Sequence, residues 1–329
     1  MLFQRKDRAL KVAFIGAGSV VFTKNLLTDT LSFPELHDID PERLETVGMM
    51  ARWTSDQLGA GAKVEEHLDR RRALEGADFV VNMVQIGMHK ATLLDFEIPR
   101  RYGLKQTIAD SMGIGGIFRG LRTIPFMLDL AGEMEELCPG AILLNYTNPM
   151  SMLTWAVYKA HPSMPVVGLC HNVPYTIREI ASYIGVPYEE IAYDGAGINH
   201  IVWLTRLECR GEDAYPRLFA AMEDPEIYAK DRVRFELMRR FGYFVTESSE
   251  HNAEYTPYFL RDDELVKRYE GRSEANLVEY AKTREKLLAG ESFPLERSVE
   301  YHRLAQEAST IQRPIPLPRH RPQRRERVI

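Results

Sequence analysis

The sequence is poor in cysteine and contains no long apolar run. Its three cysteines, Cys138, Cys170 and Cys209, are an odd and sparse set for 329 residues, which argues against a disulfide framework and favours a reducing cytoplasm. No run of eighteen apolar residues occurs, and the first residues lead directly into a predicted strand. We therefore expect no membrane span, no signal peptide and no membrane partner.

The sequence also lacks an excess of positive charge. Its net charge is −5, and an acidic chain argues against nucleic acid as the main partner. Arginine is concentrated at the end, because residues 313–329 hold six arginines against one glutamate. The Pro/Arg-rich segment 311–329 is typical of a solvated, disordered tail.

The chain opens with a strand, a glycine turn and a helix. Residues 11–15 are an apolar run that predicts a strand, and a helical pattern covers residues 20–31. The glycines between them would let the backbone approach a pyrophosphate, whose charge the amino terminus of the helix attracts. The pattern therefore predicts a dinucleotide-binding turn. The cofactor-binding residues predicted in it are Gly16, Ala17, Gly18 and Ser19.

A dinucleotide site of this type also needs an acidic residue at the end of the second strand, where it binds the ribose. Asp38 and Asp40 both stand at a plausible distance from the glycines, and Asp38 is the first candidate. The segment between Pro34 and Asp38 leaves almost no room for a second strand of usual length. A further apolar strand at residues 77–84 ends at Gln85, which we add to the predicted cofactor contacts.

The middle of the chain carries a glycine-rich segment and an Asn-Pro pair. Residues 99–120 predict a flexible lid over the cofactor, although a plain connection is an equal alternative. Asn148 follows a predicted strand at residues 141–144 and precedes a proline, so its backbone favours an extended conformation. Its amide could then point into the cleft, whereas a simple turn is the alternative.

A thiol and two imidazoles stand near the end of another predicted strand. The apolar residues 166–169 lead to Cys170 and His171, and His200 follows thirty residues after the cysteine. Ligands of open α/β sheets bind at the carboxyl ends of the strands, and few protein ligands suit an open catalytic metal site. A cysteine that closes an apolar strand is also often a small core residue. The pair Thr176 and Glu179 predicts a capping box at the start of the next helix.

The order of these elements predicts the fold class and the domains. Strands and helices alternate through the first part of the chain, which is typical of an α/β fold with a doubly wound parallel sheet. We expect a Rossmann-like domain of the lactate/malate dehydrogenase type in residues 1–170, which binds NAD. A mixed α+β, largely helical substrate domain is expected in residues 171–310.

Residues 246–258, in the predicted substrate domain, concentrate titratable groups. His251 and Tyr255 stand four residues apart and would share one face of a helix. The glutamates of this segment are most simply explained as solvated side chains. They are Glu247, Glu250 and Glu254.

Five motifs, GAGS, NYTNP, GLCHNV, GINH and ESSEHNAEY, together resemble glycoside hydrolase family 4, the NAD- and manganese-dependent glycosidases that are an exception to two-carboxylate hydrolysis. The resemblance runs from about residue 11 to residue 300 in the order of the family. The Cys170-His171 pair is similar to the α-galactosidase branch, in which a serine stands where this chain has Asn172. Branches that act on 6-phosphosugars carry Asp or Asn after the cysteine, so His171 indicates an unphosphorylated glycoside.

The resemblance implies a reaction in which hydride passes from C3 of the sugar to NAD⁺, a base removes the acidified C2 proton, and the C1 substituent is eliminated. Water then adds and the hydride returns, so there is no net oxidation. The same resemblance implies a homo-oligomer, either a dimer or a tetramer. It also implies that Cys170 and His200 bind Mn²⁺, although a thiolate is an unusual partner for this metal.

The resemblance further assigns the residues that contact the substrate. Tyr255 is similar to the C2 base of the family, and its ordinary pKa of about 10 would need the field of the metal to lower it. His171 occupies the position of the acid that assists the leaving group. Asn148 and Asp110 are implied sugar contacts.

Two other functions fit part of the sequence. A 2-hydroxy-acid dehydrogenase shares the opening fold and an Asn-Pro pair, but the Gly-x-His-Gly context that it needs is absent. A remnant that binds only the nucleotide is the second alternative. The resemblance fades near His302, where the family continues with further substrate-binding segments, and the sequence is therefore expected to be truncated.

Overall fold

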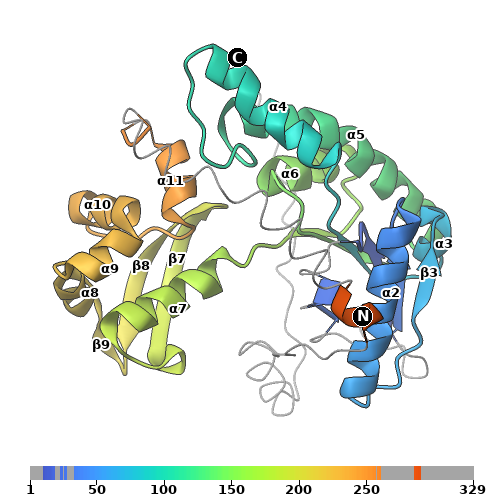
Figure 1. Ribbon diagram of the computed structural model, residues 1–329, viewed down its shortest axis with the longest axis horizontal. Helices are drawn as coiled ribbons and strands as arrows, with labels where there is room; N and C mark the ends of the chain where they lie inside the picture. The colour runs from blue at the N-terminus through green and yellow to red at the C-terminus, as the bar shows by residue number, and fades with distance from the viewer. Residues whose placement is uncertain are drawn as a thin grey trace, which may run out of the picture.

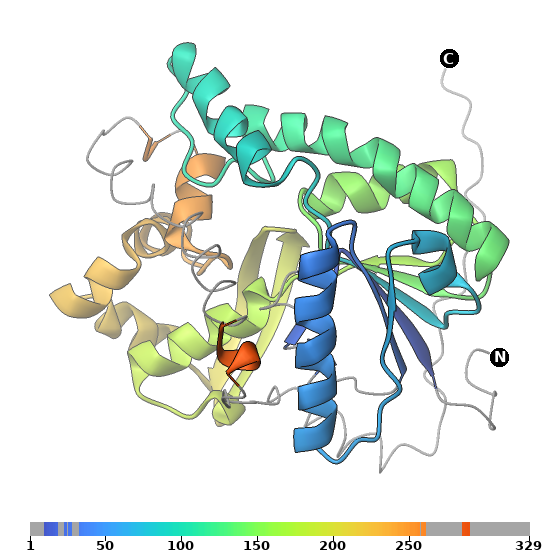
Figure 2. The same cartoon turned by 45° about the vertical axis from the view of Figure 1, so that its right-hand side comes forward.

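The structure is a computed structural model that describes residues 10–18, 23, 24, 26, 27, 33–256, 258–260 and 285–289. Figures 1 and 2 show two lobes, each built around its own β-sheet. The sheet of the first lobe is parallel, and its strand order is β3-β2-β1-β4-β5-β6. The strands are β1 (Lys11–Ile15), β2 (Phe33–His37), β3 (Glu65–His67), β4 (Phe79–Asn82), β5 (Ile142–Asn145) and β6 (Val166–Gly168).

Helices cover both faces of this sheet (Figures 1 and 2). They are α2 (Pro41–Gln57), α3 (Arg70–Leu74), α4 (Met88–Arg101), α5 (Gly113–Leu137) and α6 (Met150–Ala160). Ala13 and Ile15 of β1 pack in one core with α5 and α6, whereas Val12 and Phe14 pack in a second core with α2. Successive side chains of a strand point to opposite faces, so an apolar strand supplies both cores. The predicted doubly wound sheet is therefore confirmed.

The second strand is a full strand, and the expectation that it has almost no room was wrong. All five residues of β2 pair with β1, and Leu36 is completely buried. The strand begins before Pro34, which we had taken as its boundary. Because β3 pairs only with residues 35–37, Pro34 lies beyond the β3 ladder. The N–H group that proline lacks would therefore have no hydrogen-bond acceptor in β3.

The glycine-rich segment is also different from the expectation. Residues 113–120 are not a flexible lid but the first two turns of α5. A Cβ atom on Gly115 would lie 2.7 Å from the Ala109 Cβ, and one on Gly116 would lie 2.6 Å from the Ser111 carbonyl carbon. These glycines therefore let the loop at residues 102–112 pack directly on the helix.

The second lobe contains the antiparallel sheet β7-β8-β9. Its elements are α7 (Asn172–Ile184), a short 3₁₀ helix (Tyr188–Glu190), β7 (Ile191–Ile198), β8 (Ile201–Cys209), β9 (Glu212–Asp213), α8 (Tyr215–Ala221), α9 (Pro225–Lys230), α10 (Arg232–Phe241) and α11 (Ser249–Tyr255). The expected mixed α+β character is confirmed. The tail at residues 311–329 lies outside the described residues, as does most of the chain after residue 260.

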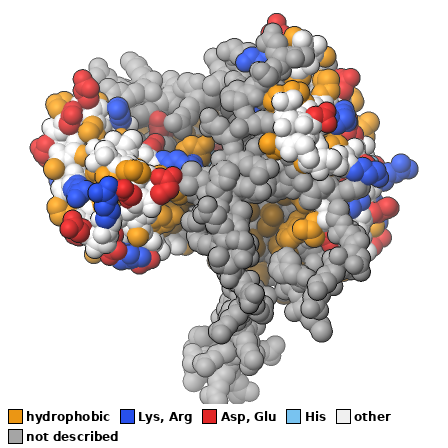
Figure 3. All heavy atoms as spheres, turned by 90° about the horizontal axis from the view of Figure 1, so that it is seen from below, with side chains coloured by type: hydrophobic (Ala, Val, Ile, Leu, Met, Phe, Trp, Pro, Cys, Tyr) orange, Lys and Arg blue, Asp and Glu red, His pale blue; other side chains and the backbone are white. Residues whose placement is uncertain are grey.

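The described surface carries charges of both signs. On the face shown in Figure 3, Lys and Arg side chains are interspersed with Asp and Glu side chains among the described residues. Among those residues, no helix is both long enough and apolar enough to cross a membrane.

Candidate metal and dinucleotide site

The predicted thiol and imidazole ligands lie together. Cys170 follows the carboxyl end of β6, and His200 lies in the turn between β7 and β8. The ligand atoms of Cys170, His200 and Glu247 all lie within 4.8 Å of one another. His200 is buried. Cys170 is half-buried, and its thiol is not part of a disulfide bond. A sulfur, a nitrogen and an oxygen converging at this distance fit a divalent cation.

Tyr255 lies beside the imidazole of His200. The Tyr255 hydroxyl is 2.7 Å from His200 Nδ1, and the two rings are stacked with their centroids 6.2 Å apart. His251 and Tyr255 are both in α11, as predicted, with their ring centroids 5.8 Å apart. Burial raises the pKa of Tyr255, and the charge of Asp110 adds to the rise. A positive charge held on the opposite nitrogen of His200 would act against this rise.

The two predicted sugar contacts touch each other. Asn148 Nδ2 donates a hydrogen bond of 3.1 Å to one carboxylate oxygen of Asp110, and Ser111 donates one of 2.7 Å to the other oxygen. Burial alone would raise the pKa of Asp110, but the neighbouring His251, whose Nε2 is 3.6 Å from the carboxylate, holds it well below its usual range. Asp110 is therefore a fixed negative charge next to Tyr255.

His171 and Asn172 begin α7 beside the metal ligands. The His171 ring is exposed and packs edge-on against Tyr175, with the ring centroids 4.9 Å apart. Neighbouring atoms partly desolvate the His171 imidazole and so lower its pKa, whereas the negative charge of Glu247 raises it. The buried Asn172 amide donates to the His200 carbonyl at 3.4 Å and to the Thr246 hydroxyl at 3.2 Å. Asn172 thus holds the His200 turn against the residues that precede α11.

The glycine turn packs closely against the end of β2. Gly16 and Ala17 donate their backbone N–H groups to the His37 carbonyl, and Gly18 donates to the Asp38 carboxylate at 2.9 Å. A Cβ atom on Gly18 would lie 2.6 Å from that carboxylate. The missing side chain therefore keeps the turn and the end of β2 in close contact, as a site that approaches a pyrophosphate and a ribose requires.

The structure separates the two candidates for the ribose-binding acid. Asp38 contacts the glycine turn, whereas Asp40 caps α2 and accepts the N–H groups of Glu42 and Arg43. Gln85 is exposed after β4 and donates to the Thr92 hydroxyl of α4. Ser19 lies outside the described residues. The geometry thus favours Asp38 over Asp40 and leaves the role of Gln85 a prediction.

Sequence comparison identifies the family. The profile described as family 4 glycosyl hydrolase matches residues 11–186, and the profile of the C-terminal domain of the same family matches residues 195–314. The chain belongs to glycosyl hydrolase family 4. The resemblance predicted from the motifs is confirmed, and it extends beyond residue 302, where it was expected to fade.

Two curated relatives of this family 4 protein are alpha-galactosidases. The protein of Bacillus subtilis (strain 168) is 43% identical over 309 residues, which are 88% of this chain and 71% of that protein. The protein of Rhizobium meliloti (strain 1021) is 36% identical over 271 residues, which are 79% of this chain and 55% of that protein. This family 4 chain therefore spans only part of the length of either relative.

Solved structures confirm the fold of the family 4 chain. The Bacillus subtilis protein lplD is 25% identical, with a TM-score of 0.79 over 88% of this chain and 74% of that chain. A 6-phospho-alpha-glucosidase from gut microorganisms, solved in complex with NAD and Mn²⁺, is 19% identical, with a TM-score of 0.75 over 93% of this chain and 75% of that chain.

Two glutamates of the family 4 site were missed, because the expectation that they are solvated was wrong. Glu247 is one of the three converging donors. One oxygen of Glu254 accepts the backbone N–H groups of Thr107, Ile108 and Ala109 at 2.8–2.9 Å. Glu254 therefore ties α11 to the loop that carries Asp110, and Figures 1 and 2 show α11 beside this segment between α4 and α5.

Proposed function

We propose that this protein is a glycosidase that hydrolyses unphosphorylated α-galactosides with the help of NAD and a divalent cation, Mn²⁺. The convergence of Cys170, His200 and Glu247 beside Tyr255 carries the proposal. Two alpha-galactosidases among the relatives and the histidine after Cys170 support the choice of substrate. An ordinary two-carboxylate glycosidase needs no thiol in its site.

Different residues of the chain bind the cation and the dinucleotide. When bound, NAD supplies a hydride acceptor and donor for C3 of the sugar, and the divalent cation supplies positive charge beside the C3 oxygen. Cys170 and His200 hold the cation. The glycine turn and Asp38 hold the dinucleotide, with Gln85 as a further contact. We assign this binding to residues 1–170, and substrate binding and catalysis to residues 171–310.

Tyr255 is positioned to take the proton from C2 of the sugar. If Nε2 of His200, the nitrogen that faces Glu247, binds the cation, then Nδ1 carries the proton. The Nδ1–H group then donates a hydrogen bond to the Tyr255 oxygen 2.7 Å away. This hydrogen bond favours the ionised form of the tyrosine over the neutral form. The imidazole therefore transmits the charge of the cation to the base.

Three other side chains act on the substrate. His171, with its exposed imidazole next to Cys170, gives a proton to the oxygen of the leaving group. Asn148 and Asp110, joined by their hydrogen bond, receive hydroxyl groups of the sugar. A fixed negative charge at Asp110 suits this role, because a carboxylate accepts hydrogen bonds from hydroxyl groups strongly.

The assay that tests this function uses the purified chain with Mn²⁺, NAD⁺, a reductant and a nitrophenyl α-galactoside. We expect release of nitrophenol without accumulation of NADH, loss of this release on chelation with EDTA, and recovery with Mn²⁺. A substrate deuterated at C2 should lose its deuterium to water. Steady NADH production from a 2-hydroxy acid would favour a dehydrogenase instead, and NAD binding without cleavage would favour a remnant.

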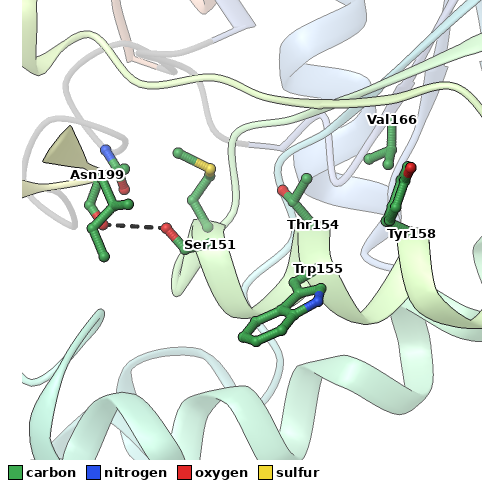
Figure 4. A pocket seen from close by; sticks show the side chains of 8 residues that line it. Ser151, Thr154, Trp155, Tyr158, Val166 and Asn199 are labelled. Atoms are coloured by element: carbon green, nitrogen blue, oxygen red, sulfur yellow. Dashed lines mark hydrogen bonds between the residues drawn. The ribbon is translucent and has the colours of Figure 1, made fainter. Parts of the chain in front are cut away.

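We also propose that the protein works in a reducing cytoplasm, because all three cysteines are free thiols, and that it forms a homo-oligomer. Apolar side chains are exposed on α5 and on α6, two helices that contact each other, including Leu121 at 67% and Trp155 at 73%. Figure 4 shows Trp155 projecting from α6 on one side and Tyr158 lying next to Val166 on another, while Ser151 of the same helix donates a hydrogen bond to the Asn199 carbonyl. Exposed apolar patches of this kind are common at contacts between subunits.

Trp155→Asp is therefore expected to shift the protein toward the monomer, because a charge would be buried in the contact between subunits. Sedimentation velocity across a range of concentrations measures the change. The control is Ile39→Asp, which places the same charge at another exposed apolar position, 87% accessible, in the loop after β2. A sedimentation coefficient that is the same for both variants and the wild type would contradict this assignment of the interface.

A further inference from the structure

Glu247 has the geometry of a metal ligand, although its sequence pattern was interpreted as that of a solvated side chain. It lies in the connection between α10 and α11, and its side chain is only 15% exposed. Its Oε2 atom is 3.8 Å from His200 Nε2, and its carboxylate lies within 4.8 Å of the Cys170 thiol as well. An ion between the three groups would therefore be within reach of all of them after small movements of the side chains.

The backbone around Glu247 is fixed in an uncommon conformation. Its φ angle is +71°, a left-handed value that residues other than glycine adopt seldom and most often at functional sites. Ser248 caps α11, and the Asn252 amide donates to the carbonyls of Thr246 and Ser248 at 3.0 Å. Hydrogen bonds thus hold the chain on both sides of Glu247, so that its carboxylate is presented at a defined place.

The two oxygens of the Glu247 carboxylate have different neighbours. Oε1 accepts the Ser248 backbone N–H at 3.2 Å and lies 3.2 Å from His251 Nδ1. Oε2 is the oxygen next to His200. A carboxylate that binds a metal ion usually has this arrangement. One oxygen is held by hydrogen bonds to the protein, which orient the group, and the other oxygen is directed at the ion.

Asp110 is the other carboxylate near His200, and it is less suited to bind the ion. Its ligand atom groups with those of His200 and His251, but both of its oxygens already accept hydrogen bonds, one from Ser111 and the other from Asn148. The set that contains Glu247 also includes the thiol. We therefore favour Glu247 as the carboxylate ligand.

The chemistry of the donor set leads to the same residue. A thiolate and an imidazole alone suit softer metals such as Zn²⁺, whereas Mn²⁺ prefers carboxylate and other oxygen ligands. A glutamate brings an anionic oxygen to the site, and together with the thiolate it balances the double charge of the ion. Three protein ligands still leave positions for hydroxyl groups of the sugar and for water.

We propose that Glu247 is a third protein ligand of the divalent cation and sets the preference of the site for Mn²⁺ over softer metals. This inference rests on the proposed function, because it needs Cys170 and His200 to bind the same ion. It goes further in naming the residue that makes a thiol-containing site suitable for Mn²⁺.

Glu247→Gln tests the proposal, because the change keeps the shape of the side chain and removes its charge. Titration of the full chain with Mn²⁺ alone, followed by the paramagnetic resonance of free Mn²⁺, should show a dissociation constant about 10–100-fold higher than in the wild type. Titration with Zn²⁺ alone by calorimetry should show a smaller loss. Glu250→Gln, the matched control three residues away, should bind both metals as the wild type does.

The outcomes separate this inference from the proposed function. A Glu247→Gln variant that binds Mn²⁺ as tightly as the wild type would overturn the inference and leave the function intact. A wild-type chain that binds no Mn²⁺ would overturn both. If Glu247→Gln does not fold, Glu247→Asp takes its place, because it keeps the charge but shortens the reach; Mn²⁺ binding equal to that of the wild type would then contradict the proposal.

Discussion

Replacing Tyr255 with phenylalanine is expected to lower kcat by about 10²–10⁴-fold, the usual contribution of a general base. The variant keeps the ring that stacks on His200 and packs near His251 and loses only the hydroxyl 2.7 Å from His200 Nδ1. Binding of NAD and of Mn²⁺ should therefore remain close to that of the wild type. The loss should fall on the step that removes the C2 proton.

The measurement combines steady-state kinetics with isotope exchange. With a substrate deuterated at C2, the wild type should release deuterium into water, and Tyr255→Phe should release it more slowly by the same factor as kcat. Tyr258→Phe is the matched control, because it removes a hydroxyl from a 68% exposed tyrosine of the same segment. Unchanged exchange in Tyr255→Phe would exclude Tyr255 as the base.

The parallel sheet could be predicted from sequence because most of its strands, unlike the polar β2 and β3, are short apolar runs between turn signals. Residues 79–82 of β4 and 142–145 of β5 have this pattern, and all of them are buried or partly buried in the sheet. The glycines of residues 113–120 were misinterpreted, because composition alone does not distinguish a flexible glycine from one that allows close packing. Only the distance from Gly116 to Ser111 reveals which of the two applies.

The site could be predicted only in part, for a similar reason. Cys170 and His200 were found because they stand in motifs of the family. Glu254 stands in the same segment as Tyr255, but its partners are backbone groups about 145 residues earlier in the chain. Nothing in the local pattern of acidic residues reports such a partner, so a buried and a solvated glutamate have the same appearance in the sequence.

Arg234 is a second example of a long-range partner, and it leads to the second large prediction. Its guanidinium is only 2% exposed and pairs with Asp231 and Glu179. It also donates to the Thr176 hydroxyl at 3.1 Å. Thr176 and Glu179 were expected to cap a helix, but α7 begins earlier, at Asn172, and both side chains bind Arg234 instead.

Arg234→Met is expected to lower the free energy of unfolding by about 3–5 kcal/mol, because the change leaves Asp231 buried without its charge partner. Asp231 also accepts a hydrogen bond of 2.5 Å from Ser249, the first residue of α11. The arginine therefore stabilises, through Asp231, the helix that carries Tyr255. Urea denaturation followed by circular dichroism measures the effect on stability.

The control and a double variant identify the cause of this loss. Arg210 pairs with Glu190 at the surface, where solvent screens the charges, so Arg210→Met should leave the unfolding midpoint unchanged. Adding Asp231→Leu to Arg234→Met removes the carboxylate that Arg234→Met leaves without a charge partner. This double variant should regain part of the lost stability, because replacing a whole buried ion pair with apolar groups often has little net cost. If the two changes are simply additive, the destabilisation does not come from the unpaired charge of Asp231 but from lost packing of Arg234 on Phe244, whose ring centroid lies 5.0 Å from the guanidinium carbon.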